Sequence, residues 1–367
     1  MFDKFCPEGV FVNIAILVLI FAFLRKIYAK KRTTSSVYVY IASFFFIAFC
    51  FYSFYDTDYY HYKEWIEKMW NRTLLKTHLE DIYIWLVKTI NYSYELFRLI
   101  VWGCATLFLF RTFKNLKLDL GVGMYIFSMI FLLIFGYARV SLGMSIAFLG
   151  FSILVSRHYL NEKIIGVIII ALSMFFHKSM FFMVPIFILS LTKFNRRMLI
   201  LALIGFSLAV YIGISYGLMS FIDSTQSDFI NSERAASYAK GAEQIKGIGW
   251  LLRTSLYRAV YYLTPILIGY IIIKRDYKAL PDYIKRFMNC AALIVLAASI
   301  FLFDLGANTD IIYIRLLYFA MIPVAISLTY IYCSMPKYSK YAAIIIFIGM
   351  MASIYDLSYK FYLAFYA

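Results

Sequence analysis

Long apolar stretches alternate with short polar connections along the whole chain. A helix of about 20 mostly apolar residues is long enough to cross a bilayer, and stretches close to this length recur throughout the sequence. The pattern therefore predicts an all-α, polytopic integral membrane protein that forms a single transmembrane domain over residues 1–367. About 12 transmembrane helices are expected, over residues 10–27, 37–55, 95–110, 118–136, 140–156, 164–176, 179–192, 198–218, 254–273, 287–303, 311–332 and 341–359.

Two parts of this pattern could be interpreted in more than one way. The first apolar run follows an acidic rather than a basic leader and has no small-residue cleavage site, so we expect it to stay in the protein as a helix. The segments 164–176 and 179–192 are short and are separated by His177 and Lys178. They either cross the membrane as two helices or form a hairpin that enters it partway.

Composition agrees with a membrane protein and excludes several other classes. The chain is 63% hydrophobic and 15% charged, whereas soluble domains are about 45–50% apolar and about 25% charged. The net charge is +16, but the sequence contains no soluble basic domain that could bind nucleic acid. The five cysteines are scattered and predict neither a disulfide framework nor a zinc site. No cofactor and no metal are expected.

Positive charges fall in alternate connections, which orients the chain in the membrane. Lys and Arg gather on the cytoplasmic side of membrane proteins. The whole net charge of +16 lies on one face of the predicted bundle, while the other face balances to zero. The charged face is predicted to be cytoplasmic, with both the N terminus and the C terminus extracytoplasmic. The basic connections are residues 25–36, 111–117, 157–163, 193–197, 274–286 and 337–340.

Ionisable side chains also occur at the opposite, outer edge of the predicted helices. Such a residue costs about 2.5–3.5 kcal/mol at the centre of a membrane helix, so it usually faces a protein interior or a wet cavity. Several arginines on one side favour a site for an anionic ligand, because the guanidinium fork binds phosphate oxygens in pairs and keeps its charge. The outer residues are Arg139, Arg253, Arg258, Arg315, His177, Lys178, Asp56 and Asp58.

These residues also have simpler interpretations. Arginine and lysine near helix ends often extend to lipid headgroups without binding a ligand, and Lys178 fits this role. The tyrosines near the outer edge are expected in the aromatic belt of the membrane surface rather than in a sugar-stacking surface. Gly143, Ala147 and Gly150 form a stripe of small residues that predicts close helix packing.

Two outer connections are long. Residues 56–94 contain tryptophans among polar residues and predict amphipathic helices at the membrane surface. Residues 219–253 are the most polar part of the chain. A loop of this length is either functional, as a lid or a guide for substrate, or a plain connector.

Four motifs together resemble those of a known family. In chain order they are DTDYYHYKEW, YARVSLGMSIAFLGFSIL, FFHKSMFFMVP and IRLLYFAMIP. The sequence resembles the EpsG family of bacterial polysaccharide polymerases, a branch of the Wzy-like proteins. The resemblance spans nearly the whole chain and is closest at residues 137–190 and 311–323.

The resemblance implies a glycosyltransferase of the bacterial inner membrane that joins undecaprenyl-pyrophosphate-linked oligosaccharides on the outer side. A hydroxyl of one lipid-linked unit would attack the anomeric carbon of the growing glycan, and the lipid pyrophosphate would leave. Fixed arginines stabilise charge where it develops, so no metal would be needed. A flippase and a chain-length regulator are the expected partner proteins. The phosphate-binding residues would be Arg139, Arg315, Arg253 and Arg258.

His177 is the first candidate for the general base, since the pKa of histidine suits proton transfer near neutral pH. The same residue would otherwise cap the turn or donate a hydrogen bond to the substrate. Asp58 is the second candidate for the base.

Three alternatives stay open. Asp56 and Asp58 resemble a metal-binding acidic pair of glycosyltransferases that use lipid-linked sugars. A transporter or flippase of lipid-linked oligosaccharide would place ionisable residues near the membrane midplane and show related halves, and the sequence shows neither. A membrane acyltransferase acting on surface glycans would consume an acyl donor instead of a lipid-linked glycan.

Overall fold

The computed structural model describes residues 85–86, 88–90, 94–131, 138–192, 248–300 and 309–366. Within these ranges the chain is helical, with short connections and no strand, which confirms the predicted all-α class. The predicted segments 10–27, 37–55 and 198–218 lie outside the described residues, as do most of the two long outer connections. The described helices divide between two compact units, Met1–Phe187 with Leu328–Ala367, and Ile188–Ser327, and each is described by itself.

Every predicted segment that falls on described residues coincides with a helix. The element that follows His177 begins with a short 3-10 helix and continues as an α-helix. The bounds are α5 Tyr94–Asn115, α6 Leu120–Phe131, α7 Ala138–Ser156, α8 Leu160–Phe176, η3 Lys178–Phe182, α9 Met183–Ser190, α13 Ile248–Ile273, η4 Asp276–Ala279, α14 Asp282–Ile300, α15 Thr309–Ser334 and α16 Pro336–Tyr366.

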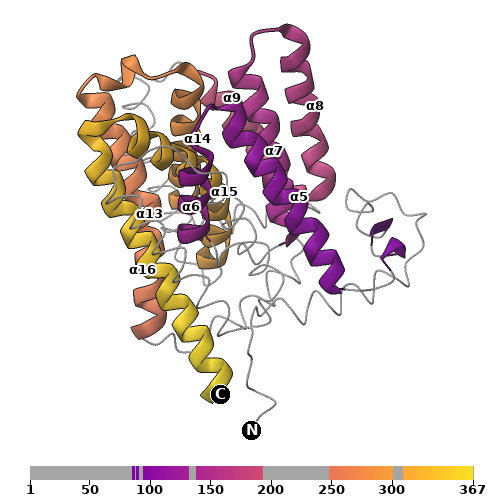
Figure 1. The fold of residues 1–367 in the computed structure, drawn as a ribbon, viewed down its shortest axis with the longest axis vertical. Helices are drawn as coiled ribbons and strands as arrows, with labels where there is room; N and C mark the ends of the chain where they lie inside the picture. Colours follow the sequence, from indigo (N-terminus) through magenta and orange to yellow (C-terminus); the bar gives the residue numbers. More distant parts are fainter. Residues whose placement is uncertain are drawn as a thin grey trace, which may run out of the picture. The chain divides into compact units, whose positions relative to one another are not determined.

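Helix α7 packs against both α5 and α8 in the first unit (Figure 1). Two glycines, Gly150 of α7 and Gly166 of α8, face each other where α7 and α8 pack. A Cβ atom at position 150 would lie only 2.6 Å from the carbonyl oxygen of Gly166 and 2.9 Å from the backbone nitrogen of Ile170. Ala147 is buried on the same helix. The stripe of small residues therefore does bring two helix backbones together, as predicted.

We expect Gly150→Ala to destabilise the protein, because the added methyl group meets backbone atoms that cannot move without shifting α8. Overpacking of this kind costs about 1–3 kcal/mol. Gly103, inside α5, is the matched control, since a Cβ atom there meets nothing within 4 Å. Gly103→Ala should be neutral or stabilise by about 0.5–1 kcal/mol through reduced backbone freedom. The measurement is thermal loss of helical circular dichroism in detergent, and equal melting of the two variants would contradict the close contact.

The polar contacts of α5 and α7 show which ends of these helices lie together. Asn115 Nδ2, at the carboxyl end of α5, donates to Ser152 Oγ of α7 at 3.1 Å. The two helices therefore run in the same direction, and α8 runs back along α7 after a short turn. Consequently the basic connections 111–117 and 157–163 lie at one end of this group. The amino end of α7 and the carboxyl end of α8 lie at the other.

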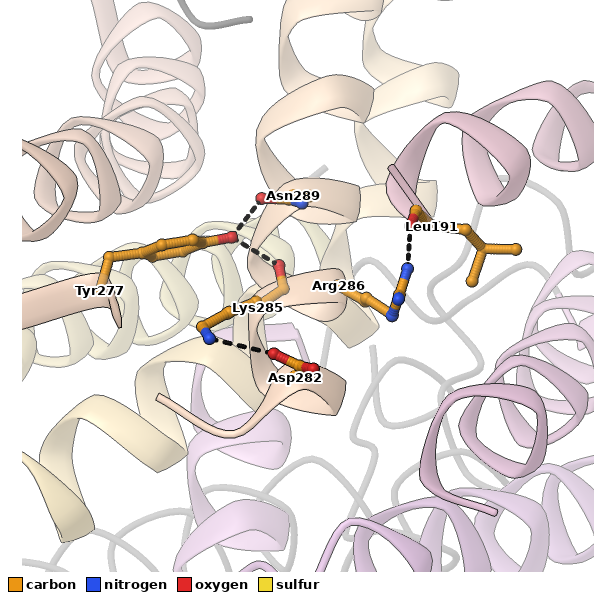
Figure 2. A network of polar contacts seen from close by, with 6 residues as sticks. All are labelled: Leu191, Tyr277, Asp282, Lys285, Arg286 and Asn289. Carbon is orange, nitrogen blue, oxygen red and sulfur yellow. Dashed lines mark hydrogen bonds and ion pairs between the residues drawn. The ribbon is translucent and has the colours of Figure 1, made fainter. Parts of the chain in front are cut away.

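In the second unit, hydrogen bonds fold the connection between α13 and α14 onto the start of α14 (Figure 2). The hydroxyl of Tyr277, in η4, lies 2.7 Å from Asn289 Oδ1 and 3.2 Å from the carbonyl oxygen of Lys285. Burial raises the pKa of Tyr277, so the phenol keeps its proton as a donor. Lys285 also pairs with Asp282 at 3.0 Å. The predicted basic connection 274–286 is thus an ordered element.

Arg286 joins this connection to a distant part of the same unit. Its Nη1 donates to the carbonyl oxygen of Leu191, immediately after α9 (Figure 2). The contact places the carboxyl end of α9 beside the amino end of α14. This arrangement is expected if the basic connections 193–197 and 274–286 lie on one face of a membrane.

Among the described residues, one helix is both long and apolar enough to cross a membrane by itself, over Leu316–Ser334 in α15. Three further apolar stretches within the described parts of helices are shorter than such a span. They are Val140–Ser156, Ser179–Ser190 and Arg258–Ile273.

Candidate active site

The turn at His177 separates α8 from η3, as the sequence predicted. His177 leaves the helical conformation with φ −159° and ψ 124°, which ends α8 at Phe176. The amide of His177 still donates to the carbonyl oxygen of Ser173 at 3.3 Å. The carbonyl of His177 accepts from the Met180 amide at 3.0 Å, which starts η3. One residue therefore terminates one helix and begins the next.

The imidazole of His177 caps the new helix through Ser179. Its Nδ1 lies 3.3 Å from the backbone nitrogen of Ser179, which donates to it. The same ring nitrogen contacts the Ser179 hydroxyl oxygen. The His177 side chain is only partly exposed. The structure thus contains the turn-capping contact that was one of the three expected roles of this histidine.

His177 lies directly against α7 at Gly143. A Cβ atom at position 143 would lie 3.2 Å from Cβ of His177 and 3.3 Å from Cγ of Met180. Met180 is buried beneath the turn. Arg139 precedes Gly143 by one helical turn, and residues four apart share one face of a helix. The fold therefore brings the backbone of Arg139 and the His177 turn to the same end of α7.

Aromatic packing fixes the helix that follows the turn. Phe187 of α9 stacks on Phe151 of α7 with ring centroids 4.5 Å apart. It also meets Phe148 edge-on at 5.4 Å. Such pairs contribute about 0.5–1.5 kcal/mol beyond the area they bury. The segment that follows α8 therefore contacts α7 at two places. The His177 turn contacts Gly143, and Phe187 of α9 contacts Phe148 and Phe151. These two contacts fix the position of His177 relative to α7.

The remaining predicted arginines belong to the second unit. Arg253 and Arg258 lie on the single continuous helix α13, as predicted. The Arg258 side chain is partly exposed, with Nε and Nη2 buried from solvent. Arg315 lies in the first half of α15. The fold does not group these three residues with the His177 turn in one unit.

The sequence motifs of this turn and of the surrounding helices match a protein family. The family model described as the EpsG family matches residues 37–366. This chain belongs to the EpsG family. The match confirms the resemblance that the four motifs indicated. The searches of curated proteins and of solved structures found no match.

EpsG-family membership makes this chain a membrane protein of polysaccharide biosynthesis, with a polymerase-like, glycosyltransferase-like function. Within the described ranges, no group of three or more His, Cys, Asp or Glu side chains is arranged to hold a metal ion. Asp56 and Asp58, which form the acidic pair of the first outer connection, lie outside those ranges.

Two residues of this candidate site were missed by reasoning from the sequence. Gly143 was assigned to helix packing alone, although its missing side chain also makes room for His177. Ser179 was assigned no role, yet it supplies both the amide and the hydroxyl that meet Nδ1 of His177. A serine two residues after a helix-ending histidine is a local signal for such a contact, since short polar side chains favour turns and caps.

Proposed function

We propose that this EpsG-family protein is a polysaccharide polymerase that joins undecaprenyl-pyrophosphate-linked repeat units on the outer side of the bacterial inner membrane. The observation that supports it is the match to the EpsG family over residues 37–366. The places of the cationic candidates agree with the proposal. Arg139 lies in the first turn of α7 (Ala138–Ser156), and His177 and Lys178 lie at the start of η3. Arg258 lies in the first half of α13 (Ile248–Ile273), and Arg315 lies in the first half of α15 (Thr309–Ser334).

The reaction is a displacement at the anomeric carbon. An acceptor hydroxyl attacks that carbon, the bond to the lipid pyrophosphate breaks, and the pyrophosphate leaves with the bonding electrons. Arg139 and Arg315 bind the pyrophosphate and stabilise its developing charge, which makes a metal ion unnecessary. Arg253 and Arg258 are five residues apart, about 140° around a helix, so one of them faces the substrate. That arginine binds phosphates of the second carrier.

His177 takes the proton from the acceptor hydroxyl as the general base. Its position beside α7, one helical turn from Arg139, supports this role because the base and the phosphate-binding arginine must reach neighbouring parts of the substrate. Asp58 is the alternative base.

A chain that crosses the membrane several times fits the apolar surface of the described helices. Contiguous exposed apolar side chains are rare on soluble monomers, but they are expected where a helix faces lipid. Helix α8 has one such surface, and α16 has another. The exposed residues are Ile164, Ile165, Val167, Ile168, Leu172 and Phe175 on α8, and Tyr341, Ile344, Phe347 and Met351 on α16.

The proposed orientation predicts which positions can be labelled from outside intact cells. In a variant without native cysteines, a membrane-impermeant thiol reagent should label His61→Cys and Lys240→Cys. It should fail to label Lys30→Cys, Asn195→Cys and Lys278→Cys, because these lie in basic connections that are cytoplasmic in this orientation. Labelling in permeabilised cells controls for reactivity. Outside labelling at position 278 would overturn the orientation and the assignment of the site to the outer face.

The function itself is tested with purified protein and synthetic undecaprenyl-pyrophosphate-linked repeat units. A polymerase converts them into a ladder of longer glycans and releases carrier pyrophosphate. A transporter or flippase would move the same lipids between leaflets of a vesicle and leave their length unchanged. An acyltransferase would leave the glycan length unchanged and consume an acyl donor, so each of these results would overturn the proposal.

A further inference from the structure

Ser179 presents two different groups to the same nitrogen of His177. Its backbone amide lies 3.3 Å from Nδ1 and can only donate a hydrogen bond. Its side-chain hydroxyl contacts Nδ1 and can either donate or accept. The hydroxyl is therefore the group of Ser179 that suits Nδ1 in every protonation state of the ring.

These two groups favour different tautomers of a neutral imidazole. If the amide donates to Nδ1, that nitrogen is unprotonated and the proton of the ring is on Nε2, which then cannot act as a base. If instead Nδ1 carries the proton, the Ser179 hydroxyl accepts from it and Nε2 has its lone pair available for proton transfer. The hydrogen bond of one ring nitrogen thus decides what the other can do.

We propose that Ser179 is a positioning residue. In the reactive tautomer of His177 the Ser179 hydroxyl accepts from Nδ1–H, in place of the donation from the Ser179 amide to Nδ1, and Nε2 takes the proton. This inference rests on the proposed function. During the reaction the proton of the acceptor hydroxyl moves to Nε2 while the Nδ1–H bond to Ser179 stays in place. The resulting imidazolium donates from Nδ1–H to the hydroxyl oxygen of Ser179. It later releases the Nε2 proton to water.

The packing contacts of His177 do not select one tautomer of its ring. His177 is held at its Cβ atom by Gly143, and the turn is anchored by the buried Met180. These contacts fix where the ring is attached but do not distinguish between its two nitrogens. The Ser179 hydroxyl does, because it is the hydrogen-bonding side-chain group that meets Nδ1.

The test compares Ser179→Thr with Ser179→Val in the full-length protein. Threonine and valine have nearly the same shape, so both disturb η3 alike, but only threonine keeps a hydroxyl. Initial rates of glycan elongation are measured between pH 5 and 9, per amount of folded protein. We expect Ser179→Thr to keep most of the activity and Ser179→Val to lose about 10–100-fold, the effect of a hydrogen bond to a charged group.

The pH profile separates positioning from a merely structural role. The rate of a general base falls as the pH drops through its pKa. Without the hydroxyl the imidazolium loses an acceptor, so the pKa of His177 decreases and the acidic limb moves to lower pH by about one unit. His177→Gln combined with Ser179→Val should be no slower than His177→Gln alone, because the two residues act as one unit.

Each contrary outcome points to a different error. If Ser179→Val matches Ser179→Thr in rate and pH profile while His177→Gln is inactive, the polymerase and its base stand and the role of Ser179 is wrong. The role of Ser179 is also wrong if Ser179→Val reduces the amount of folded protein but not the rate per folded molecule. If His177→Gln elongates glycans normally, the base role is wrong and the role of Ser179 fails with it. If the wild-type protein makes no ladder, the proposed function is wrong.

Discussion

Replacing His177 by glutamine is expected to slow glycan elongation by about 10²–10⁴, the usual effect of removing a general base. Glutamine keeps a hydrogen-bonding side chain of a reach similar to that of histidine. Its amide cannot take up a proton near neutral pH. Loss of activity in this variant therefore reports on proton transfer rather than on the turn. Elongation rate and binding of both lipid-linked substrates are measured on purified protein, and binding should be retained.

His158→Gln is the matched control for this experiment. His158 is exposed in the short connection between α7 and α8, at the opposite end of α7 from His177. The same substitution there should leave the rate unchanged. If His177→Gln instead elongates glycans at nearly the wild-type rate, His177 is not the base. The base role would then pass to Asp58 in the first outer connection.

A second large loss is expected at Arg139. Arg139→Lys keeps the positive charge but removes the planar fork that binds two phosphate oxygens at once. Removing one preorganised group that stabilises developing charge costs about 10²–10³ in rate. We expect Arg139→Lys to fall in this range and Arg139→Ala to lose at least as much. Arg315→Lys should behave similarly. The measurement is elongation rate at saturating lipid-linked substrate.

Arg157→Lys provides the control for charge and shape. Arg157, in the α7–α8 connection, pairs with Glu162 in the first turn of α8 at 3.6 Å, and both side chains are partly exposed. Exposed pairs of this kind contribute about 0–1 kcal/mol, so the substitution should leave elongation unchanged. Wild-type polymer from both Arg139→Ala and Arg315→Ala, at equal protein levels, would show that neither arginine binds the pyrophosphate.

The sequence predicted the described helices because their apolar stretches are long and regular. It placed their ends less well. Helix α13 begins at Ile248 rather than 254, and α16 continues to Tyr366 rather than 359. The added residues, 248–253 and 360–366, are mostly apolar or aromatic, and each stretch contains one charged residue, Arg253 or Lys360. A charged residue interrupts a hydropathy pattern, whereas the backbone hydrogen bonds of a helix continue through it.

The turn of the candidate site was predicted from the sequence, but its contacts were not. The apolar runs around His177 were enough to predict a break between two helices. The approach of His177 to Gly143 depends on the packing of α8 and η3 against α7, which no local pattern encodes. The link between Arg286 and Leu191 joins residues far apart in the chain and was equally invisible. The hydrophobic pattern of a sequence predicts each helix separately and does not predict which residues of different helices touch.

The Arg286 contact also has a consequence for how the protein is made. The last carbonyls of a helix have no partners within it, and one of the groups that follow α9, the Leu191 carbonyl, is capped by a side chain 95 positions later in the chain. Ribosomes add about 5–20 residues per second, so roughly 5–20 s pass between the synthesis of the two residues. Throughout that interval the nascent chain must satisfy this carbonyl with water or with headgroups. The hydrogen bond from Arg286 to the Leu191 carbonyl therefore forms only after the ribosome has synthesised α13 and the start of α14.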